Sequence, residues 1–195
     1  MHRSDKKSQK PGGRERLIAT ARDLFTRRGA SNVGINDVTD AAGIARMTLY
    51  NNFSSKEALT AAVYAELADT TLRELRELES TERSEEERVI ALFDYLDGKA
   101  HGAEYRGCPF IHASLQAAEP NGPIFELVHS YKCALREHVL QLLDKCRANR
   151  FELADQIVIL LDGAVMEAYL KGVAHPESSA KRAVTTLLLA NHVAG

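Results

Sequence analysis

The sequence predicts an all-α fold of about nine helices, and three observations lead to this prediction. Apolar residues recur at the i, i+3, i+4, i+7 spacing of an amphipathic helix in one stretch after another. No stretch of convincing length alternates apolar and polar residues in the way that a half-buried strand does. The chain has 195 residues, of which 45% are hydrophobic, so it is long enough to bury one or two cores.

The first helices are short and lie close together in the sequence. Residues 1–13 are polar and basic and end in Pro-Gly-Gly, which predicts a flexible arm or a disordered terminus. The apolar spacing then predicts an amphipathic helix over 14–28. Two shorter helices follow, over 35–42 and 46–53, and Gly43 lies in the turn between them.

A longer helix is expected to begin just after this pair. Ser54 and Glu57 have the spacing of a capping box, in which each side chain accepts a hydrogen bond from the other residue's backbone N–H. The apolar spacing that begins at Leu59 continues to Leu78, which either extends this helix or starts another. Residues 81–88 are too polar for a core, so they are expected to form a connection or an exposed first turn.

Five further stretches complete the helical pattern. They are expected over 89–98, around 111–118, from about 123 to 142, over 153–171 and over 176–194. The stretch over 153–171 is apolar nearly all round, so its helix requires burial on two sides.

The charge is distributed unevenly along a chain whose formal net charge is only −2. Residues 1–56 contain 11 Lys and Arg against 5 Asp and Glu, a net charge of +6. The remaining residues contain 14 against 22, a net charge of −8. This division predicts that the first part meets a polyanion and that the second part has a different task.

Composition and motifs exclude several other classes of protein. The three cysteines form no CxxC pair, which argues against a disulfide framework and a zinc site and favours a reducing cytoplasm. Residues 1–10 lack the apolar stretch of a secretory signal, and the apolar run over 157–161 is far shorter than the roughly 20 residues that span a bilayer. No HExxH, GxSxG, P-loop or dinucleotide-binding pattern occurs, so we expect no enzyme, catalytic residue, metal or cofactor.

Residues 35–53 fit a helix-turn-helix, in which the second helix enters the major groove of DNA. The residues that carry this motif are Gly29, Val38, Ala42-Gly43-Ile44, Thr48-Leu49-Tyr50, Phe53, Ser55-Lys56-Glu57 and Leu59. Together they resemble the DNA-binding domain of the tetracycline-repressor (TetR) family over about residues 14–60. The resemblance implies a DNA-binding domain over 14–60 and an effector-binding and dimerisation domain over 61–195.

The motif also predicts a small core and an exposed reading surface. The core is expected to contain Ile35, Val38, Ile44, Leu49 and Phe53, packed against Leu17, Ala21 and Leu24. The candidate DNA-binding residues are Arg46, Met47, Thr48, Tyr50, Asn51, Asn52 and Lys56. Arg46 can pair with guanine or a phosphate, and Thr48 with a phosphate or a thymine methyl group. Either Asn51 or Asn52 can read adenine.

The resemblance adds two phosphate contacts and shows three departures from the family pattern. It places the Tyr50 hydroxyl and the Lys56 ammonium on phosphates, although a packing residue and a solvated charge would have the same sequence. Ala45 replaces the usual Ser or Thr, which removes a helix cap worth typically ~1 kcal/mol. Met47 and Val33-Gly34 also differ from the usual residues, so the operator sequence is not predictable.

By resemblance, the last two helices would pair with those of a second copy. The candidate interface residues are Ile157, Leu161, Val165, Ala168, Ala183, Leu187 and Leu188. A solitary buried core helix would have the same apolar pattern over 153–171. Dimerisation is favoured because two recognition helices about 34–36 Å apart can read a palindromic operator.

The family also implies an effector pocket between the middle helices. Its candidate lining residues are Phe93, Leu96, Cys108, His112, Leu115, Phe125, Val128, Tyr131, Met166 and Tyr169. The same residues would also suit an ordinary core. The sequence therefore predicts a ligand-responsive regulator, most simply a repressor that a small-molecule effector releases from double-stranded DNA. The alternative is a redox sensor in which Arg106 lowers the pKa of Cys108, against which an inert buried cysteine must be weighed.

Overall fold

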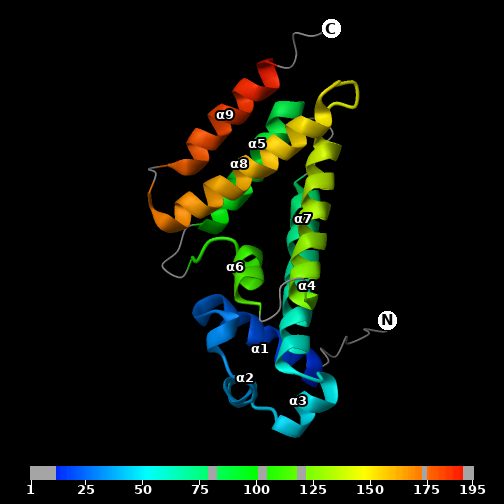
Figure 1. The fold of residues 1–195 in the computed structure, drawn as a ribbon, viewed down its shortest axis with the longest axis vertical. Coiled ribbons are helices and arrows are strands. Elements are labelled where there is room, and N and C mark those ends of the chain that lie inside the picture. The colour runs from blue at the N-terminus through cyan, green and yellow to red at the C-terminus, as the bar shows by residue number, and fades with distance from the viewer. Residues whose placement is uncertain (1–11, 79–82, 101–104, 118–121, 173–174, 191–195) are drawn as a thin grey trace, which may run out of the picture. The chain divides into compact units, whose positions relative to one another are not determined.

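The structure is a computed structural model that describes residues 12–78, 83–100, 105–117, 122–172 and 175–190. Within these ranges it contains nine α-helices, one short 3-10 helix and no strand, which confirms the all-α prediction (Figure 1). Contacts divide the chain into two compact units, Met1–Tyr64 and Ala65–Gly195. Among the described residues no helix is both long and apolar enough to cross a membrane.

The first unit is a small helical domain. Its elements are α1 (Gly13–Arg28), η1 (Ala30–Asn32), α2 (Ile35–Ala42), α3 (Arg46–Asn52) and the first part of α4 (Lys56–Glu77). Its buried side chains include Leu17, Ile18, Ala21, Phe25, Val33, Val38, Leu49, Phe53 and Leu59. Leu24, Ile35 and Ile44, also expected in this core, are half-buried.

The turn between α2 and α3 is held by backbone geometry and by one arginine. Gly43 adopts the left-handed conformation at φ +60°, which L side chains rarely adopt. The backbone N–H of Ile44 donates to the carbonyl of Thr39 at 3.0 Å. Arg16 reaches across from α1 and donates through Nη2 to the carbonyl of Ala42 at 2.5 Å. The exit of α2 is therefore fixed to α1, and this sets where α3 begins.

The cap of α4 lies one residue later than the sequence indicated. The helix starts at Lys56, and Ser55 Oγ accepts the backbone N–H of Ala58 at 3.1 Å. The predicted pairing of Ser54 with Glu57 was wrong, because the residue immediately before the first helical residue provides the cap.

The second unit packs five helices with the rest of α4. These are α5 (Glu85–Ala100), α6 (Pro109–Gln116), α7 (Pro123–Leu142), α8 (Arg150–Leu170) and α9 (Pro176–Ala190). Helices α8 and α9 run side by side, and both contact α5 (Figure 1). The core contains Leu92, Phe93, Leu135, Val139, Leu143, Leu153, Ile157, Leu161, Val184 and Leu188. Helix α5 begins at Glu85, so residues 85–88 form its first turn.

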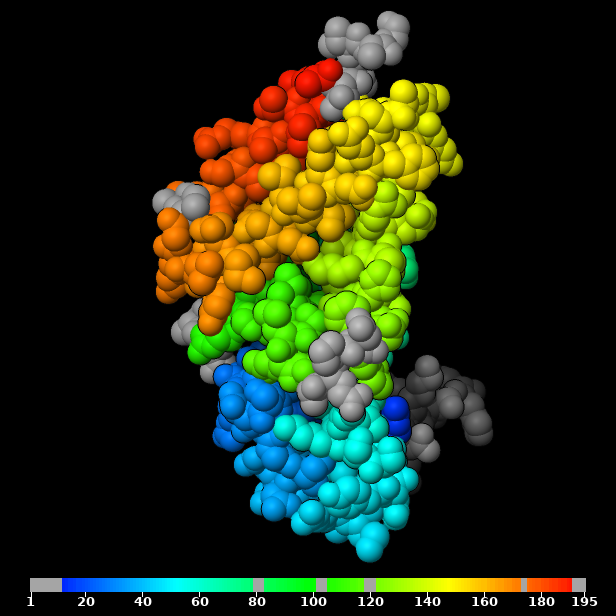
Figure 2. All heavy atoms as spheres, in the orientation of Figure 1, coloured from blue at the N-terminus to red at the C-terminus, as the bar shows by residue number. Residues whose placement is uncertain are grey.

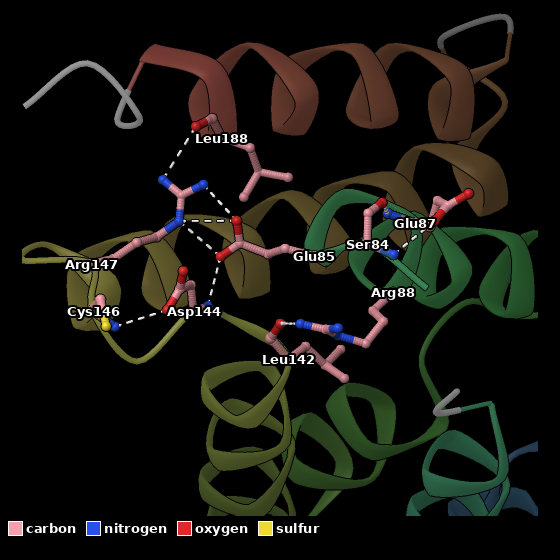
Figure 3. Close-up of polar contacts among 9 residues, drawn as sticks. All are labelled: Ser84, Glu85, Glu87, Arg88, Leu142, Asp144, Cys146, Arg147 and Leu188. Carbon is pink, nitrogen blue, oxygen red and sulfur yellow. Dashed lines mark hydrogen bonds and ion pairs between the residues drawn. The ribbon is translucent and has the colours of Figure 1, made fainter. Parts of the chain in front are cut away.

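A buried ion pair joins three parts of this unit (Figure 3). The side chains of Arg147 and Glu85 are only 5% and 13% exposed. Arg147 Nε donates to Glu85 Oε1 at 2.8 Å, and Arg147 Nη1 donates to the Leu188 carbonyl at 3.2 Å. The backbone N–H of Asp144 also donates to Glu85 Oε1, at 2.7 Å. The pair therefore connects the start of α5, the α7–α8 connection and the end of α9.

A second polar contact joins α4 to α5. Glu74 accepts hydrogen bonds from the Tyr95 hydroxyl at 2.6 Å and from Lys99 Nζ at 2.9 Å. These two donors hold the pKa of Glu74 below its ordinary value of 4.5.

Candidate nucleic-acid interface and ligand pocket

Helix α3 exposes most of its side chains. Leu49 is fully buried and anchors the helix in the core of the first unit. Ala45 precedes the helix and makes no side-chain cap, as its missing hydroxyl requires. On the face drawn in Figure 2, the atoms around residues 40–55 form the lower edge of this unit, uncovered by its other parts. Leu49 thus anchors the helix, Thr48 is half-buried, and the other side chains of α3 are exposed.

Three pairs of residues on α3 have the i, i+4 spacing that places them side by side on the helix surface. Arg46 lies over the ring of Tyr50, with the guanidinium carbon 5.6 Å from the ring centroid, and donates to its hydroxyl at 3.4 Å. Asn52 Nδ2 donates to the carbonyl of Thr48 at 2.8 Å. The third pair, Met47 and Asn51, is exposed.

The seven candidate DNA-binding residues all lie in the first unit, at differing exposure. Thr48 and Lys56 are half-buried, and the other five, Arg46, Met47, Tyr50, Asn51 and Asn52, are exposed. A Cβ atom placed at Gly13 would lie 3.6 Å from Thr48 Cγ2, so the Thr48 methyl group faces α1. Lys56 Nζ donates to the Ser31 carbonyl at 3.4 Å. Contact of these residues with DNA stays a prediction.

A hollow in the second unit opens between α5, α8 and α9. It measures about 280 Å³ including its open mouth. Its walls are formed by Phe93, Leu96, Asp97, Ala100, Tyr105, Ala164, Val165, Ala168, Pro176 and Glu177. The Tyr105 hydroxyl donates to the Val165 carbonyl at 3.1 Å, and burial raises the Tyr105 pKa to about 12. Of the predicted pocket residues, Phe93 and Leu96 line this hollow.

Four other predicted pocket residues, Cys108, His112, Tyr131 and Tyr169, lie on or next to α6, α7 and α8. Phe110 stacks on Tyr131 with ring centroids 3.8 Å apart, and His112 meets the edge of Tyr169 at 5.6 Å. Cys108 is buried beside them. Figure 2 shows the surface of α6 beside that of α7 and below that of α8. These side chains fill the space between the helices and do not line the hollow.

The remaining pocket residues correct the prediction further. Leu115 is 77% exposed and Phe125 is 41% exposed, so both lie on the surface. Val128 is buried and Met166 is half-buried, and neither lines the hollow. Helical spacing alone placed these residues on an inward face, but α6 and the start of α7 are covered on one side only.

Cys108 lacks the environment of a redox-sensing thiol. Burial raises the pKa of the Cys108 thiol, and the nearby Lys132 ammonium offsets only part of this effect. The redox alternative requires a lowered pKa and an accessible sulfur. The structure therefore favours the inert buried cysteine.

Three of the seven predicted dimer residues are buried within the chain itself, and the other four stay a prediction. Ile157, Leu161 and Leu188 are 0%, 2% and 3% exposed within one chain, so they belong to its own core. Val165 and Ala168 line the hollow, and Ala183 and Leu187 are half-buried. The large apolar residues that α8 and α9 do expose are Phe151, Ile159, Leu170 and Leu189, all at least 59% exposed. Three of them, Phe151, Ile159 and Leu170, lie on α8, and the signal in the sequence was that this helix is apolar nearly all round.

Among the described residues, no group of three or more His, Cys, Asp or Glu side chains is arranged to hold a metal ion.

Comparison with known proteins identifies the first unit. Residues 17–63 match the family model "Bacterial regulatory proteins, tetR family". An uncharacterized HTH-type transcriptional regulator of Mycobacterium tuberculosis is 45% identical over 53 residues, which cover 27% of this chain and only 26% of that relative. The "Probable acrEF/envCD operon repressor" of Escherichia coli K12 is 30% identical over 165 residues, 77% of this chain and 71% of that protein.

The likeness also extends through the second unit. A TetR-family transcriptional regulator from Streptomyces coelicolor has a TM-score of 0.79 and 25% identity, covering 91% of this chain and 95% of that one. The fold, the exposed α3 and these matches define a helix-turn-helix regulator of transcription. The chain belongs to the TetR family, whose members bind DNA. The relatives named above are described as regulators or repressors of transcription.

Proposed function

We propose that this chain is a ligand-responsive repressor that binds a palindromic operator as a homodimer and is released by a small-molecule effector. The observation that carries the proposal is α3, which buries Leu49 and presents polar side chains outward in a unit of the family's helix-turn-helix type. The net charge of +6 over residues 1–56 supports attraction to DNA phosphates.

The DNA contacts divide into positioning and reading contacts. Tyr50 and Lys56 would position the unit, because a phenol hydroxyl and an ammonium both donate to phosphate oxygens. Arg46 already lies against Tyr50, so the two can approach one phosphate together. The basic arm predicted over 1–13, of which residues 1–11 lie outside the described part of the chain, can reach further phosphates.

Dimerisation would use the exposed apolar side chains of α8 and α9. Phe151, Ile159 and Leu170 lie on α8, and Leu189 lies on α9. A two-fold axis places the same patch on both partners, so each copy covers the other's apolar residues. It also supplies the second recognition helix that a palindrome requires.

The hollow between α5, α8 and α9 is the proposed entry for the effector. Its walls are mainly apolar, and its two charged side chains are the carboxylates of Asp97 and Glu177. Such a lining favours neutral or cationic organic molecules over anions. An effector would act by binding more tightly to the conformer whose recognition helices are wrongly spaced for DNA.

The DNA-binding proposal is tested with the double variant Tyr50→Phe/Lys56→Ala. A duplex enriched from a random pool by the full-length chain is fluorescein-labelled, and its binding is followed by anisotropy across a salt series. The variant should bind at least about tenfold more weakly, and its logarithmic salt slope should fall by about 1. Lys145→Ala removes an exposed lysine of the second unit and serves as the control. An unchanged affinity in the double variant would reject the two phosphate contacts.

The effector proposal is tested with three probes of similar shape. Benzyltrimethylammonium is cationic, neopentylbenzene is its neutral carbon isostere, and benzenesulfonate is anionic. Calorimetric titration should show the cation or the isostere binding and the anion failing to bind, and Ala164→Trp should block binding by filling the hollow. Preferential binding of the anion would contradict the assignment of the carboxylate-lined hollow.

A further inference from the structure

We infer that Met47 and Asn51 form the base-reading ridge of α3, with Met47 contacting a thymine methyl group and Asn51 pairing with an adenine within about two base pairs of that thymine. The inference rests on the proposed function, because it specifies what the DNA-binding surface reads. Three features of the first unit carry it.

The first feature is direction. Successive residues of an α-helix are rotated by about 100°, so Met47 and Asn51 both lie about 200° from Leu49, which is fully buried. They therefore project from the side of α3 opposite the core. Met47 is 72% exposed, more than any other large apolar residue in the described part of this unit. A recognition helix points this side at the base edges when it enters the major groove.

The second feature is that the other candidate DNA-binding residues of α3 already make contacts within the protein. Asn52 Nδ2 already donates to the Thr48 carbonyl, and the Thr48 methyl group faces the Gly13 end of α1. Arg46 lies on the Tyr50 ring, on the flank that phosphate contacts would use. The Asn51 amide, by contrast, makes no hydrogen bond to any residue that the structure describes, so its donor and acceptor are both available.

The third feature is chemistry. An asparagine amide can donate to N7 and accept from N6 of adenine, a pairing that specifies this base in the major groove. The Met47 side chain has no strong donor or acceptor, so the group it recognises is apolar, and the thymine methyl is the apolar group of that groove. The two residues are about 6 Å apart along the helix axis, and base pairs rise by about 3.4 Å. They therefore reach base pairs that lie within about two steps of each other.

Base analogues test each contact by removing one group from DNA. The probe is the duplex enriched by the full-length chain, with single replacements in one half-site of thymine by uracil, which lacks the methyl group, or of adenine by 7-deazaadenine, which lacks N7. Wild type should lose about fourfold in affinity at one thymine, the value for one buried methyl group, and about tenfold at one adenine. These two positions should lie within about two base pairs of each other.

The protein variants complete two double-mutant cycles. Met47→Ala should bind the thymine and uracil duplexes with equal affinity. Asn51→Ala should bind the adenine and 7-deazaadenine duplexes with equal affinity. Thr48→Ser and Asn52→Ala are the matched controls, and each should keep both analogue penalties whatever its total affinity.

The outcomes separate this inference from the function on which it rests. A uracil penalty that persists in Met47→Ala, or the absence of any such penalty in wild type, would overturn the methyl contact. An adenine penalty that vanishes in Asn52→Ala but persists in Asn51→Ala would transfer the reading to Asn52. If the chain enriched no duplex at all, the proposed DNA-binding function would be rejected, and the inferred base contacts of Met47 and Asn51 would be rejected with it.

Discussion

The two units of the chain use charged and apolar side chains in opposite ways. In the described part of the first unit, the exposed large apolar residues are Met47 and Tyr50, both on α3. Among its described residues, the second unit exposes six such side chains, Leu115, Phe125, Phe151, Ile159, Leu170 and Leu189, and it buries the ion pair of Arg147 with Glu85. A surface that meets phosphates must be mainly polar, with an apolar side chain where it faces an apolar group such as a thymine methyl, whereas a surface that meets another protein copy can remain broadly apolar. The contrast predicts different sensitivities to mutation in the two units.

The largest expected effect is on the buried ion pair of the second unit. Arg147→Met leaves the Glu85 carboxylate buried without its partner, so we expect a loss of about 3–5 kcal/mol in the free energy of unfolding. Arg136→Met, which removes an ion pair whose side chains are 37% and 53% exposed, should cost much less because solvent screens an exposed pair. Urea unfolding followed by circular dichroism measures both. Equal losses of stability in the two variants would show that burial does not determine how much an ion pair contributes here.

The next effect concerns the exposed apolar face of α8. Ile159→Glu places a charge where the second copy is expected to pack, and it should weaken the dimer by on the order of 2 kcal/mol, or about 30-fold. Sedimentation across a concentration series measures the dissociation constant. Leu115→Glu, at an equally exposed leucine on α6, is the control and should leave it unchanged. If only the control variant dissociated, the interface would have to be moved to α6.

The smallest effect compares glycines in the two units. Gly43→Ala should destabilise the first unit by about 1–2 kcal/mol, because Gly43 has φ +60°, although its nearest neighbour is 3.6 Å from the added Cβ. Gly98→Ala, inside α5 with nothing within 4 Å of the added Cβ, should instead stabilise the second unit by about 0.5–1 kcal/mol. Thermal unfolding of the two variants supplies the test. If both substitutions changed the stability in the same direction, either the strain assigned to Gly43 or the gain in helix propensity assigned to Gly98→Ala would be wrong.

The order and extent of the helices followed closely from the sequence. The 3.6-residue spacing and the breaks at glycine and proline placed all nine α-helices near their observed positions, and Gly43 was correctly expected in the α2–α3 turn. The errors concerned only the exact starts of two helices. The α4 cap lies at Ser55 because the helix starts at Lys56, and α5 begins at Glu85 because charged residues are tolerated in a solvated first turn.

Residue roles in the second unit were predicted less well. The apolar pattern of α8 showed that two of its sides need cover, but it did not show which side faces the chain's own core. Ile157 and Leu161 are buried within the chain, and Ile159 is exposed. Likewise, the spacing of Leu115 and Phe125 suggested an inward face that the neighbouring helices do not cover. The Arg147–Glu85 pair gave no sequence signal, because its partners are 62 residues apart.

The sequence by itself determined the helical fold, the helix-turn-helix and its reading helix, because these depend on contacts between residues that are near in the chain. A local period, a left-handed glycine and a capping serine act within one or two turns of backbone. Only the tertiary structure decided which apolar side chains are core and which remain at the surface, where the hollow opens, and that Cys108 is buried with a raised pKa. Those properties depend on which helices pack together. Helical periodicity shows that a helix has an apolar face, but it does not show which other helix packs against that face.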